Sequence, residues 1–351
     1  MRRFLKSTIK DVAEQAGVSI STVSIFMNGR EDVCSAKTAE RIRSAVAALN
    51  YTPSSLVSGM QKHTTTTIGV CMHEPSDVQV SFGSFFIHRL WQGILSQADE
   101  VDYSILHYPA SVRNNARYEA FLDGRVDGVL FHATTEYSAC AKRVAEAGMP
   151  TILMTRSLHL PEGCGSVYVD EQRTVDLALS HLWELGHRRI AHVAGPVERD
   201  CDIAITRLEA YKAWLGAHGA FDPDLIAHAG SWVIDHAPEI VEAWTKLSDP
   251  PTAVFCANDA LALSVIEAAE QRGLSVPDDL SVVGVDNSDA GRDAPIPLTT
   301  VSIGVDEVGK EAVRALLRLM QGAPIADCRV GLPVSDLVVR RTTGPSAVAS
   351  P

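Results

Sequence analysis

Apolar and polar positions near the start of the chain follow the spacing of short helices joined by a tight turn. Thr8 is placed to cap a first helix, and Asp11 stands at the third helical position, which completes a capping box. Gly17 gives the backbone freedom that a tight turn needs, and Ser19 can cap a second helix. The pattern therefore predicts a helix-turn-helix within residues 8–29.

A third helix is expected next, with Ser35 as its cap. Ile42, Ala45, Val46 and Leu49 recur at spacings of three and four, so they form one apolar stripe. Such a stripe can cover the first two helices and complete a small helical domain.

Charge is divided unevenly along the chain. Residues 1–62 carry a net charge of +4, whereas the whole chain stands at −12. A basic head on an acidic body suits a protein that contacts phosphates through one end only. In a helix-turn-helix, side chains at the start of the second helix reach base edges in the major groove. We therefore expect double-stranded DNA as a partner. The alternative is a small helical domain that binds a protein or nothing.

From Thr67 onward the pattern changes to short apolar runs separated by helical segments. The expected strands are IGVCM from residue 68, YSILHY from 103, DGVLF from 127, PTILM from 150, RIAHVAG from 189, TAVFCAND from 252 and LSVVGVD from 280. Continuous apolar runs are buried on both faces, which is typical of parallel sheets covered by helices. Two sets of strands predict two Rossmann-like subdomains with a cleft between them.

Composition narrows the class of protein further. The chain is 46% apolar and 21% charged, as in ordinary globular proteins. No apolar run approaches membrane length and the start lacks the apolar stretch of a secretory signal, so we expect a cytoplasmic protein with no membrane partner. The seven cysteines stand singly, without metal-site spacing. No enzyme motif is found, so neither catalysis nor a metal or cofactor is expected.

Residues 8–29 resemble the amino-terminal module of the lactose-repressor (LacI/GalR) family of bacterial transcription regulators, and the resemblance continues through Tyr51-Thr52-Pro53 into the core. It implies an all-α helix-turn-helix head plus an α/β core of two Rossmann-like parallel-sheet subdomains of periplasmic-binding-protein type. The expected domains are residues 1–51 for the head, 52–66 for the hinge helix and linker, 67–186 with 304–331 for the core N-subdomain, 187–303 with 332–342 for the core C-subdomain, and 343–351 for a flexible tail.

The resemblance also assigns residues to two sites. DNA contact is expected from Thr8, Ser19, Ile20, Ser21, Thr22, Ser24, Ile25, Asn28, Thr38 and Tyr51 in the head and from Ser54, Val57 and Met60 in the hinge. Effector contact in the cleft is expected from Phe86, Arg207 and Asp286, which match family positions. It is also expected from His73, Trp232 and Asn258, which follow predicted strands, because ligands of open parallel sheets sit beyond the carboxyl ends of the strands. A sugar site needs this mixture, because a guanidinium and planar acceptors pair with hydroxyls and an aromatic face covers the ring.

Some positions depart from the family pattern or have a second interpretation. Ile25 stands where relatives commonly carry Arg or Lys, and Met60 where they carry a wedging leucine, so the operator is expected to differ from the common half-sites. Asp259 is interpreted as a helix cap before a ligand, and Asp170 as a helix-start or interface residue.

The resemblance implies how the protein works. A homodimer represses a carbohydrate-utilisation operon and leaves a pseudo-palindromic operator when a sugar effector binds in the core cleft. Two alternatives stay open at this point. The effector can instead be a co-repressor, such as a purine or another metabolite, or the protein can be a sugar sensor that acts without DNA.

Overall fold

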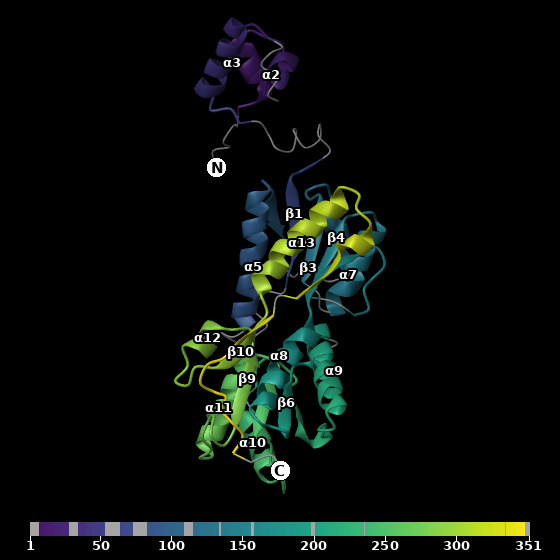
Figure 1. The fold of residues 1–351 in the computed structure, drawn as a ribbon. Coiled ribbons are helices and arrows are strands. Elements are labelled where there is room, and N and C mark those ends of the chain that lie inside the picture. Colours follow the sequence, from purple (N-terminus) through teal and green to yellow (C-terminus); the bar gives the residue numbers. More distant parts are fainter. Residues whose placement is uncertain are drawn as a thin grey trace. The chain divides into compact units, whose positions relative to one another are not determined.

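The computed structural model describes residues 7–27, 34–52, 64–72, 83–108, 115–132, 135–155, 158–197, 201–234, 236–333 and 335–347. The chain divides into two compact units, Met1–Thr65 and Thr66–Pro351. Figure 1 shows both as ribbons. No helix among the described residues is long and apolar enough to cross a membrane.

The first unit contains the helices α1 (Ile9–Ala16), α2 (Ile20–Met27) and α3 (Ala36–Ala48). Its turns form as the sequence predicts. The Thr8 side chain accepts from the Asp11 backbone amide, and the Asp11 carboxylate accepts from the Thr8 backbone amide, which completes the capping box. Gly17 ends α1 with φ +61°, and Ser19 Oγ accepts from the Thr22 backbone at 3.1 Å. The apolar stripe of α3 is buried against α1 and α2, which confirms the three-helix head.

The second unit contains two sheets and the helices that cover them (Figure 1). In chain order its elements are β1 (Thr67–Cys71), α5 (Gly83–Glu100), β2 (Ser104–His107), η3 (Asn115–Phe121), β3 (Gly128–His132), α7 (Thr135–Glu146), β4 (Thr151–Met154), β5 (Gly165–Val169), α8 (Glu171–Glu184), β6 (Ile190–Ala194), α9 (Asp202–Ala217), η5 (Pro223–Leu225), β7 (Ile226–His228), α10 (Ala237–Thr245), β8 (Ala253–Cys256), α11 (Asp259–Gln271), β9 (Ser281–Val285), α12 (Asp289–Arg292), β10 (Thr299–Ser302), α13 (Val305–Met320), η6 (Ile325–Cys328), β11 (Arg329–Leu332) and β12 (Asp336–Val338).

The two sheets each have six strands. The first has the order β11-β5-β4-β3-β1-β2 and is parallel throughout. The second has the order β12-β10-β9-β8-β6-β7 and is parallel except for β12, which runs antiparallel to β10. Every strand named in the sequence analysis forms. The strands β5, β7, β10, β11 and β12 are not among those predicted, because their runs are only three to five residues long and include polar or charged residues.

Both faces of each sheet are buried, as continuous apolar strands require. In the first sheet, Val70 and Leu130 pack with residues of α5 and α13, whereas their neighbours Val129 and Phe131 pack with residues of α7. The second sheet alternates in the same way between α8 and α9 on one face and α10 and α11 on the other. The expected helix-covered parallel sheets are therefore confirmed.

The first crossing between the sheets differs from the sequence prediction. We expected residues 67–186 to stay together, with the crossing near Gly186. Instead α8 packs on α9 and on strands of the second sheet. Thr174 Oγ1 lies 2.9 Å from Ser335 Oγ, and Arg173 Nε donates to the Ser335 carbonyl at 3.3 Å. The chain therefore crosses just before α8, at Asp170, because the apolar face of this helix is buried on the second sheet.

The segment after residue 342 also differs from the prediction of a flexible tail. His181 Nε2 lies 2.9 Å from Thr343 Oγ1, and His187 Nε2 lies 3.0 Å from the Gly344 carbonyl. The Ser346 amide donates to the Leu185 carbonyl at 2.8 Å. These bonds fix residues 343–346 along the end of α8, so the prediction is wrong for this part of the tail.

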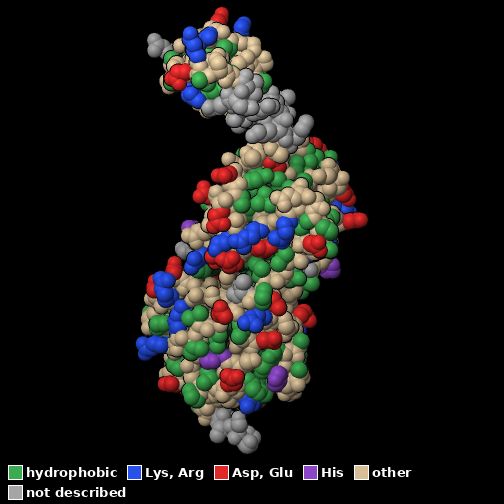
Figure 2. All heavy atoms as spheres, turned by 45° about the horizontal axis from the view of Figure 1, so that its top comes forward, with side chains coloured by type: hydrophobic (Ala, Val, Ile, Leu, Met, Phe, Trp, Pro, Cys, Tyr) green, Lys and Arg blue, Asp and Glu red, His purple; other side chains and the backbone are tan. Residues whose placement is uncertain are grey.

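Several charged side chains on the core surface form ion pairs with neighbours of the opposite charge. On the face shown in Figure 2, basic and acidic groups lie next to one another. Along α13, Lys310 Nζ lies 2.5 Å from Glu307 Oε1, and Arg318 Nη2 lies 2.8 Å from Glu311 Oε1. Exposed pairs of this kind contribute little to stability, but they leave this helix without an excess of one charge.

Candidate functional site

One face of α2 is open to solvent. Val23 and Phe26 are buried against α1 and α3, which turns Ile20, Ser21 and Ile25 outward. Ile20 is 48% exposed and Ile25 is 37% exposed, so this face presents two large apolar side chains to solvent. A short helix that buries one face in its own domain and exposes apolar and hydroxyl side chains on the other has the form of a recognition helix.

The head residues expected to contact DNA fall into two groups. Ile20, Ser21, Ser24 and Ile25 lie on the outer side of α2, and Ser21 Oγ lies 2.7 Å from Ser19 Oγ. The others also serve the fold: Thr8 and Ser19 cap helices, Thr22 and Thr38 bond to the capping hydroxyls of Ser19 and Ser35, and Tyr51 packs on the head core. Asn28, Ser54, Val57, Met60 and His73 lie outside the described residues.

Sequence reasoning missed one residue of the head. Arg41 Nη2 donates to the carbonyls of Ala16, in a very short contact, and of Gly17, at 3.0 Å. The guanidinium thus satisfies carbonyl groups left open at the end of α1 and ties α3 to the turn. Its position on the exposed side of α3 gave no signal for this, because the contact joins residues far apart in sequence.

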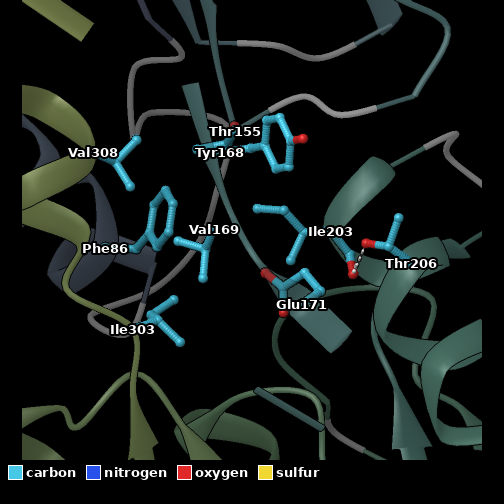
Figure 3. A pocket seen from close by; sticks show the side chains of 9 residues that line it. All are labelled: Phe86, Thr155, Tyr168, Val169, Glu171, Ile203, Thr206, Ile303 and Val308. Carbon is cyan, nitrogen blue, oxygen red and sulfur yellow. Dashed lines mark hydrogen bonds between the residues drawn. The ribbon is translucent and has the colours of Figure 1, made fainter. Parts of the chain in front are cut away.

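The core holds a pocket where strands β4 and β5 end and where the chain crosses between the sheets (Figure 3). The side chains leave a cavity of about 10 Å³ between them, and the wider space of about 330 Å³ around it includes open solvent. The lining residues come from both sides of the crossing, and they are Phe86, Thr155, Tyr168, Val169, Glu171, Ile203, Thr206, Ile303 and Val308. Pockets beyond the carboxyl ends of parallel strands are the usual ligand sites of such folds.

A buried ion pair lies behind the pocket wall. Arg207, on α9, is only 1% exposed, and its Nε and Nη2 lie 2.8 Å and 2.6 Å from Glu171 Oε2. Nη1 donates to the Ala257 carbonyl in a very short contact. Burial raises the pKa of Glu171, and the Arg207 charge opposes that rise. The guanidinium therefore donates hydrogen bonds through Nε and Nη1, whereas Nη2 lies within ion-pair distance of Glu171 but has no hydrogen-bond partner among the described residues.

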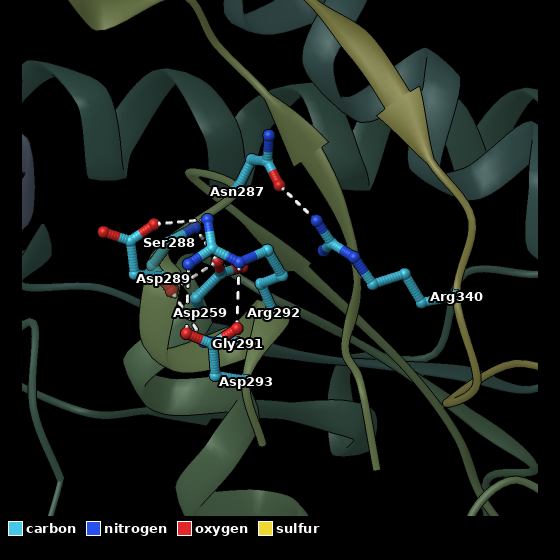
Figure 4. A network of polar contacts seen from close by, with 8 residues as sticks. All are labelled: Asp259, Asn287, Ser288, Asp289, Gly291, Arg292, Asp293 and Arg340. Atoms are coloured by element: carbon cyan, nitrogen blue, oxygen red, sulfur yellow. Dashed lines mark hydrogen bonds and ion pairs between the residues drawn. The ribbon is translucent and has the colours of Figure 1, made fainter. Parts of the chain in front are cut away.

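A second polar cluster occupies the ends of β8, β9 and β10 (Figure 4). Asp259, which is 1% exposed, accepts from the backbone and hydroxyl of Ser288 at 2.7 Å and 2.8 Å and from Thr300 Oγ1 at 2.6 Å. Arg340 Nη2 donates to Asn287 Oδ1 at 2.6 Å. Asp286 and Asn287 both have positive φ, +116° and +55°, a strained backbone that persists only where the surroundings hold it.

Burial raises the pKa of Asp259 to about 6, and the donors from Thr300 and Ser288 oppose the shift only in part. Burial and then the charge of Asp259 raise the pKa of Asp286 well above its ordinary value. Two carboxyl groups that share one buried region cannot both ionise easily. This cluster therefore makes folding stability depend on pH.

Replacing Asp259 with Asn is expected to reduce that dependence. A carboxyl with a higher pKa in the folded chain stabilises the fold when protonated, so its contribution is complete below about pH 4 and is lost as pH rises through about 6. The free energy of unfolding of the wild type should fall relative to that of D259N by about 3 kcal/mol between these limits. Urea unfolding at a series of pH values measures the difference.

Asp293→Asn provides the control for this prediction. Asp293 is exposed, and its hydrogen bond from Arg292 lowers its pKa. The contribution of Asp293 to the free energy of unfolding is therefore lost as pH falls, whereas that of Asp259 is lost as pH rises. A difference between wild type and D259N that stays constant with pH would show that Asp259 titrates normally.

The structure brings some of the expected effector residues to the pocket and leaves others aside. Phe86 lines it, and Arg207 reaches it only through Glu171. Trp232 lies over Gly195, where an added Cβ would come within 2.8 Å of the indole ring. Asp286 lies in the neighbouring cluster and is not among the described residues that line the pocket.

Asn258 takes the capping role that was expected of Asp259. Asn258 caps α11, since its Oδ1 accepts from the Leu261 amide at 2.8 Å, and its Nδ2 donates to the Trp232 carbonyl at 3.0 Å. The expected cap, Asp259, is the first residue of the helix and binds Ser288 and Thr300 instead. In contrast, Asp170 caps α8, as predicted.

Glu171 is the main residue of the cleft that sequence reasoning missed. It directly follows Asp170 at the start of α8, where an acidic residue is ordinarily explained by the helix dipole. A signal existed in the pattern, because Glu171 falls at the carboxyl end of a strand, as Asn258 and Asp286 do. The strand itself, β5, was not predicted.

Comparisons with known proteins cover both units. Residues 8–54 match the family described as bacterial regulatory proteins, lacI family, and residues 179–343 match the periplasmic binding protein-like domain. The chain is 32% identical over 316 residues to the HTH-type transcriptional repressor PurR of Aliivibrio salmonicida, which covers 89% of this chain and 91% of that protein. It is 31% identical over 317 residues to the ribose operon repressor of Escherichia coli, which covers 89% and 92%.

Solved structures agree with these sequence matches. The Lac repressor dimer bound to operator and the anti-inducer ONPF superimposes with a TM-score of 0.79 at 27% identity, over 96% of this chain and 99% of that one. A complex of the transcriptional regulator CelR with cellobiose gives a TM-score of 0.67 at 27% identity, with the same coverage. The similarity thus extends over the head and the core together.

Proposed function

Because this chain belongs to the lacI family of bacterial regulatory proteins and is a DNA-binding transcription repressor, we propose that it acts as a homodimer on a carbohydrate-utilisation operon. In this proposal, a sugar effector bound in the core pocket releases the repressor from a pseudo-palindromic operator. Regulators of this family are not enzymes, and the proposal assigns no catalysis to the core.

The observation that carries the DNA part of the proposal is the outward face of α2. Ile20, Ser21, Ser24 and Ile25 share it, while the caps and the buried residues keep the helix in place. Apolar and hydroxyl groups of this kind suit a thymine methyl group and one permissive hydrogen bond. The missing basic residue at Ile25 supports an operator that differs from the family's common half-sites.

The pocket supports the effector part of the proposal. Its walls come from α5 and α13, which cover the first sheet, and from α9, which covers the second. A ligand that contacts Phe86 and Val308 on one side and Ile203 and Thr206 on the other draws the two subdomains toward one arrangement. The complexes of CelR with cellobiose and of the Lac repressor with ONPF show that similar chains bind small molecules.

Genome-wide binding of the protein at physiological salt, with and without a panel of sugars and purines, tests the proposal. We expect a palindromic site next to genes for sugar uptake or hydrolysis, and loss of binding when one sugar is added. Binding that strengthens when a purine is added would favour the co-repressor alternative. The absence of any site under all conditions would contradict DNA regulation and favour a sensor.

Ser21→Ala is expected to change the relative affinity for the bases at one operator position by roughly tenfold, since it removes an exposed hydroxyl from the outer face of α2. Ser44→Ala makes the same change on the exposed side of α3 and should leave base preference unaltered. Binding to a library of operator variants measures both. Equal preferences for wild type and S21A would show that Ser21 does not read a base.

A further inference from the structure

Three hydroxyl side chains contact one another at the start of α2. Ser19 Oγ lies 2.7 Å from Ser21 Oγ and 2.8 Å from Thr22 Oγ1. The Thr22 backbone amide also donates to Ser19 Oγ, at 3.1 Å. These side chains form a hydroxyl cluster in which Ser19 is the central member. Within the described part of the head, the Ser21 and Thr22 hydroxyls have no hydrogen-bond partner besides Ser19.

The number of protons in the hydroxyl cluster limits its hydrogen bonding. A hydroxyl group has one proton to donate and two lone pairs with which to accept. One lone pair of Ser19 Oγ is occupied by the Thr22 amide. Ser19 therefore accepts from only one of its two hydroxyl neighbours and donates its own proton to the other. Two of the three protons are used inside the cluster, and the third is left for a group outside it.

The direction of these bonds decides what Ser21 offers to a ligand. If Thr22 donates to Ser19 and Ser19 donates to Ser21, the Ser21 hydroxyl keeps its proton for an outside acceptor. If Ser21 donates to Ser19 and Ser19 donates to Thr22, Ser21 can only accept, and the free proton lies on Thr22. A group that binds the free proton at one end of the cluster thus fixes the bonding at the other end.

The position of Thr22 favours the second arrangement on DNA. Val23 and Phe26 are buried in the head, and the helical repeat places Ser21 in the middle of the opposite face and Thr22 at its flank. An α-helix about 10–12 Å wide fills a major groove about 12 Å wide, so its flank lies against a wall of phosphates. Phosphate oxygens only accept, and a charged acceptor binds a proton more strongly than a neutral base edge does. A phosphate beside Thr22 therefore takes the free proton.

We propose that Ser19 transmits the direction of hydrogen bonding from a phosphate to a base. Thr22 donates to the phosphate, Ser19 to Thr22 and Ser21 to Ser19, so that Ser21 Oγ accepts from a base amino group. That group is N6 of adenine or N4 of cytosine, and Ser21 does not read the keto oxygens of thymine and guanine. The inference rests on the proposed function, in which the outer face of α2 reads the operator, and it narrows the permissive hydrogen bond expected there to one direction.

Single-group changes in the operator test the direction of the bond with the full chain. An operator is selected from duplexes with randomised half-sites, and Ser21→Ala identifies the base pair that Ser21 reads. At that pair, deoxynebularine for adenine or pyrimidin-2-one for cytosine removes the amino group, whereas 4-thiothymine or 6-thioguanine weakens the keto acceptor. We expect removal of the amino group to weaken wild-type binding about fivefold, and the keto change to weaken it less than about twofold. In S21A both effects should fall below about 1.5-fold, which corrects for changes in the duplex itself.

Thr22→Val tests whether the hydroxyl cluster sets this direction. Valine keeps the shape of the side chain and the backbone amide that Ser19 caps, but it removes the hydroxyl that faces the phosphate. Ser19 is then free to donate to Ser21, and Ser21 is free to donate to the base. The cost of removing the amino group should therefore fall below about twofold. A loss of the helix cap does not explain this result, because the cap is retained.

Ser19→Asp in the T22V background should restore the amino preference. Aspartate caps a helix as well as serine does, and its carboxylate only accepts, so Ser21 must donate to it and read the amino group again. The cost of removing that group should return to about fivefold in S19D/T22V. Total affinity should be lower for every duplex, because the added negative charge faces the phosphates.

Thr38→Val is the matched control. Thr38 Oγ1 lies 3.0 Å from the capping hydroxyl of Ser35, and the Thr38 amide donates to it at 3.3 Å, so the variant removes the same contact from the start of α3. Any loss of affinity in T38V should be equal for both duplexes, and the cost of removing the amino group should remain about fivefold.

Four results would overturn the proposal: S21A changes no base preference, the wild type tolerates loss of the amino group, T22V reads that group as the wild type does, or S19D/T22V does not regain the preference. A chain that selects an operator but gives one of the last three results contradicts this inference alone. A chain that selects no duplex at all contradicts the proposed function, and the inference fails with it.

Discussion

Replacing Gly309 with alanine is expected to lower the free energy of unfolding by about 3 kcal/mol. Gly309 lies where α13 crosses α5 without a side chain between the two helices. A Cβ there would overlap the carbonyl oxygen of Leu90, and a Cβ on Gly93 of the facing helix would overlap that of Asp306. Because the obstacles are backbone atoms, the helices must separate, and no rotamer change can relieve the overlap. Urea unfolding of the purified chain measures the loss.

The same substitution at Gly216 is the matched control. This glycine lies in α9, and nothing lies within 4 Å of an added Cβ. There alanine should stabilise the protein by up to about 1 kcal/mol, since it favours the helical backbone more than glycine does. A lower free energy of unfolding in G309A and a higher one in G216A would support the close crossing of the two helices. An unchanged free energy of unfolding in G309A would contradict it.

The crossing also positions the pocket, so G309A should weaken effector binding as well as stability. Phe86 lies on α5 and Val308 lies on α13, directly beside Gly309. Moving the helices apart separates these two walls. The effect on binding is to be measured well below the unfolding transition, so that loss of folded protein does not mimic it.

Arg207→Gln is expected to abolish the effector response and to destabilise the chain by about 3–5 kcal/mol, because it leaves the Glu171 carboxylate buried without its partner. The double variant E171Q/R207Q should recover most of this stability, since it buries no unpaired charge. It should bind operator DNA as the wild type does and no longer respond to the effector.

A double-mutant cycle over wild type, E171Q, R207Q and the double variant measures the coupling between the two side chains. Strong coupling between the two side chains in the free energy of unfolding, together with loss of the effector response in both variants that lack Arg207, is the expected result. If R207Q were as stable as the wild type, the pair would not hold the pocket wall. If DNA binding disappeared in the double variant, Arg207 would serve the repressor fold rather than the effector.

Much of the head could be predicted from the sequence because its structure depends on local contacts. The capping box of Thr8 and Asp11, the turn at Gly17 and the caps at Ser19 and Ser35 each involve residues a few positions apart. Side-chain caps and glycine turns act over this range. Arg41 escaped prediction because its partner carbonyls lie 25 and 24 residues away.

The cleft was predictable in position but not in its bonding. Apolar runs gave the parallel strands, and the rule for their carboxyl ends gave the place. Contacts across the sheet decided which of two neighbouring side chains caps a helix and which one bonds to residues of other elements. Asn258 and Asp259 are adjacent and both polar, yet only the second meets Ser288 and Thr300. The family resemblance marked Arg207, but its engagement with Glu171 joins residues 36 positions apart.

By itself, the sequence determined the helix-turn-helix head, the two helix-covered parallel sheets and the family, because caps, turns and apolar periodicity are local properties of the chain. The tertiary structure decided that α8 belongs to the second sheet, that residues 343–346 are tied down, and that Glu171 stands between Arg207 and the pocket. Those outcomes depend on which distant groups share a buried space. There, desolvation requires every charge and hydrogen-bonding group to find a partner.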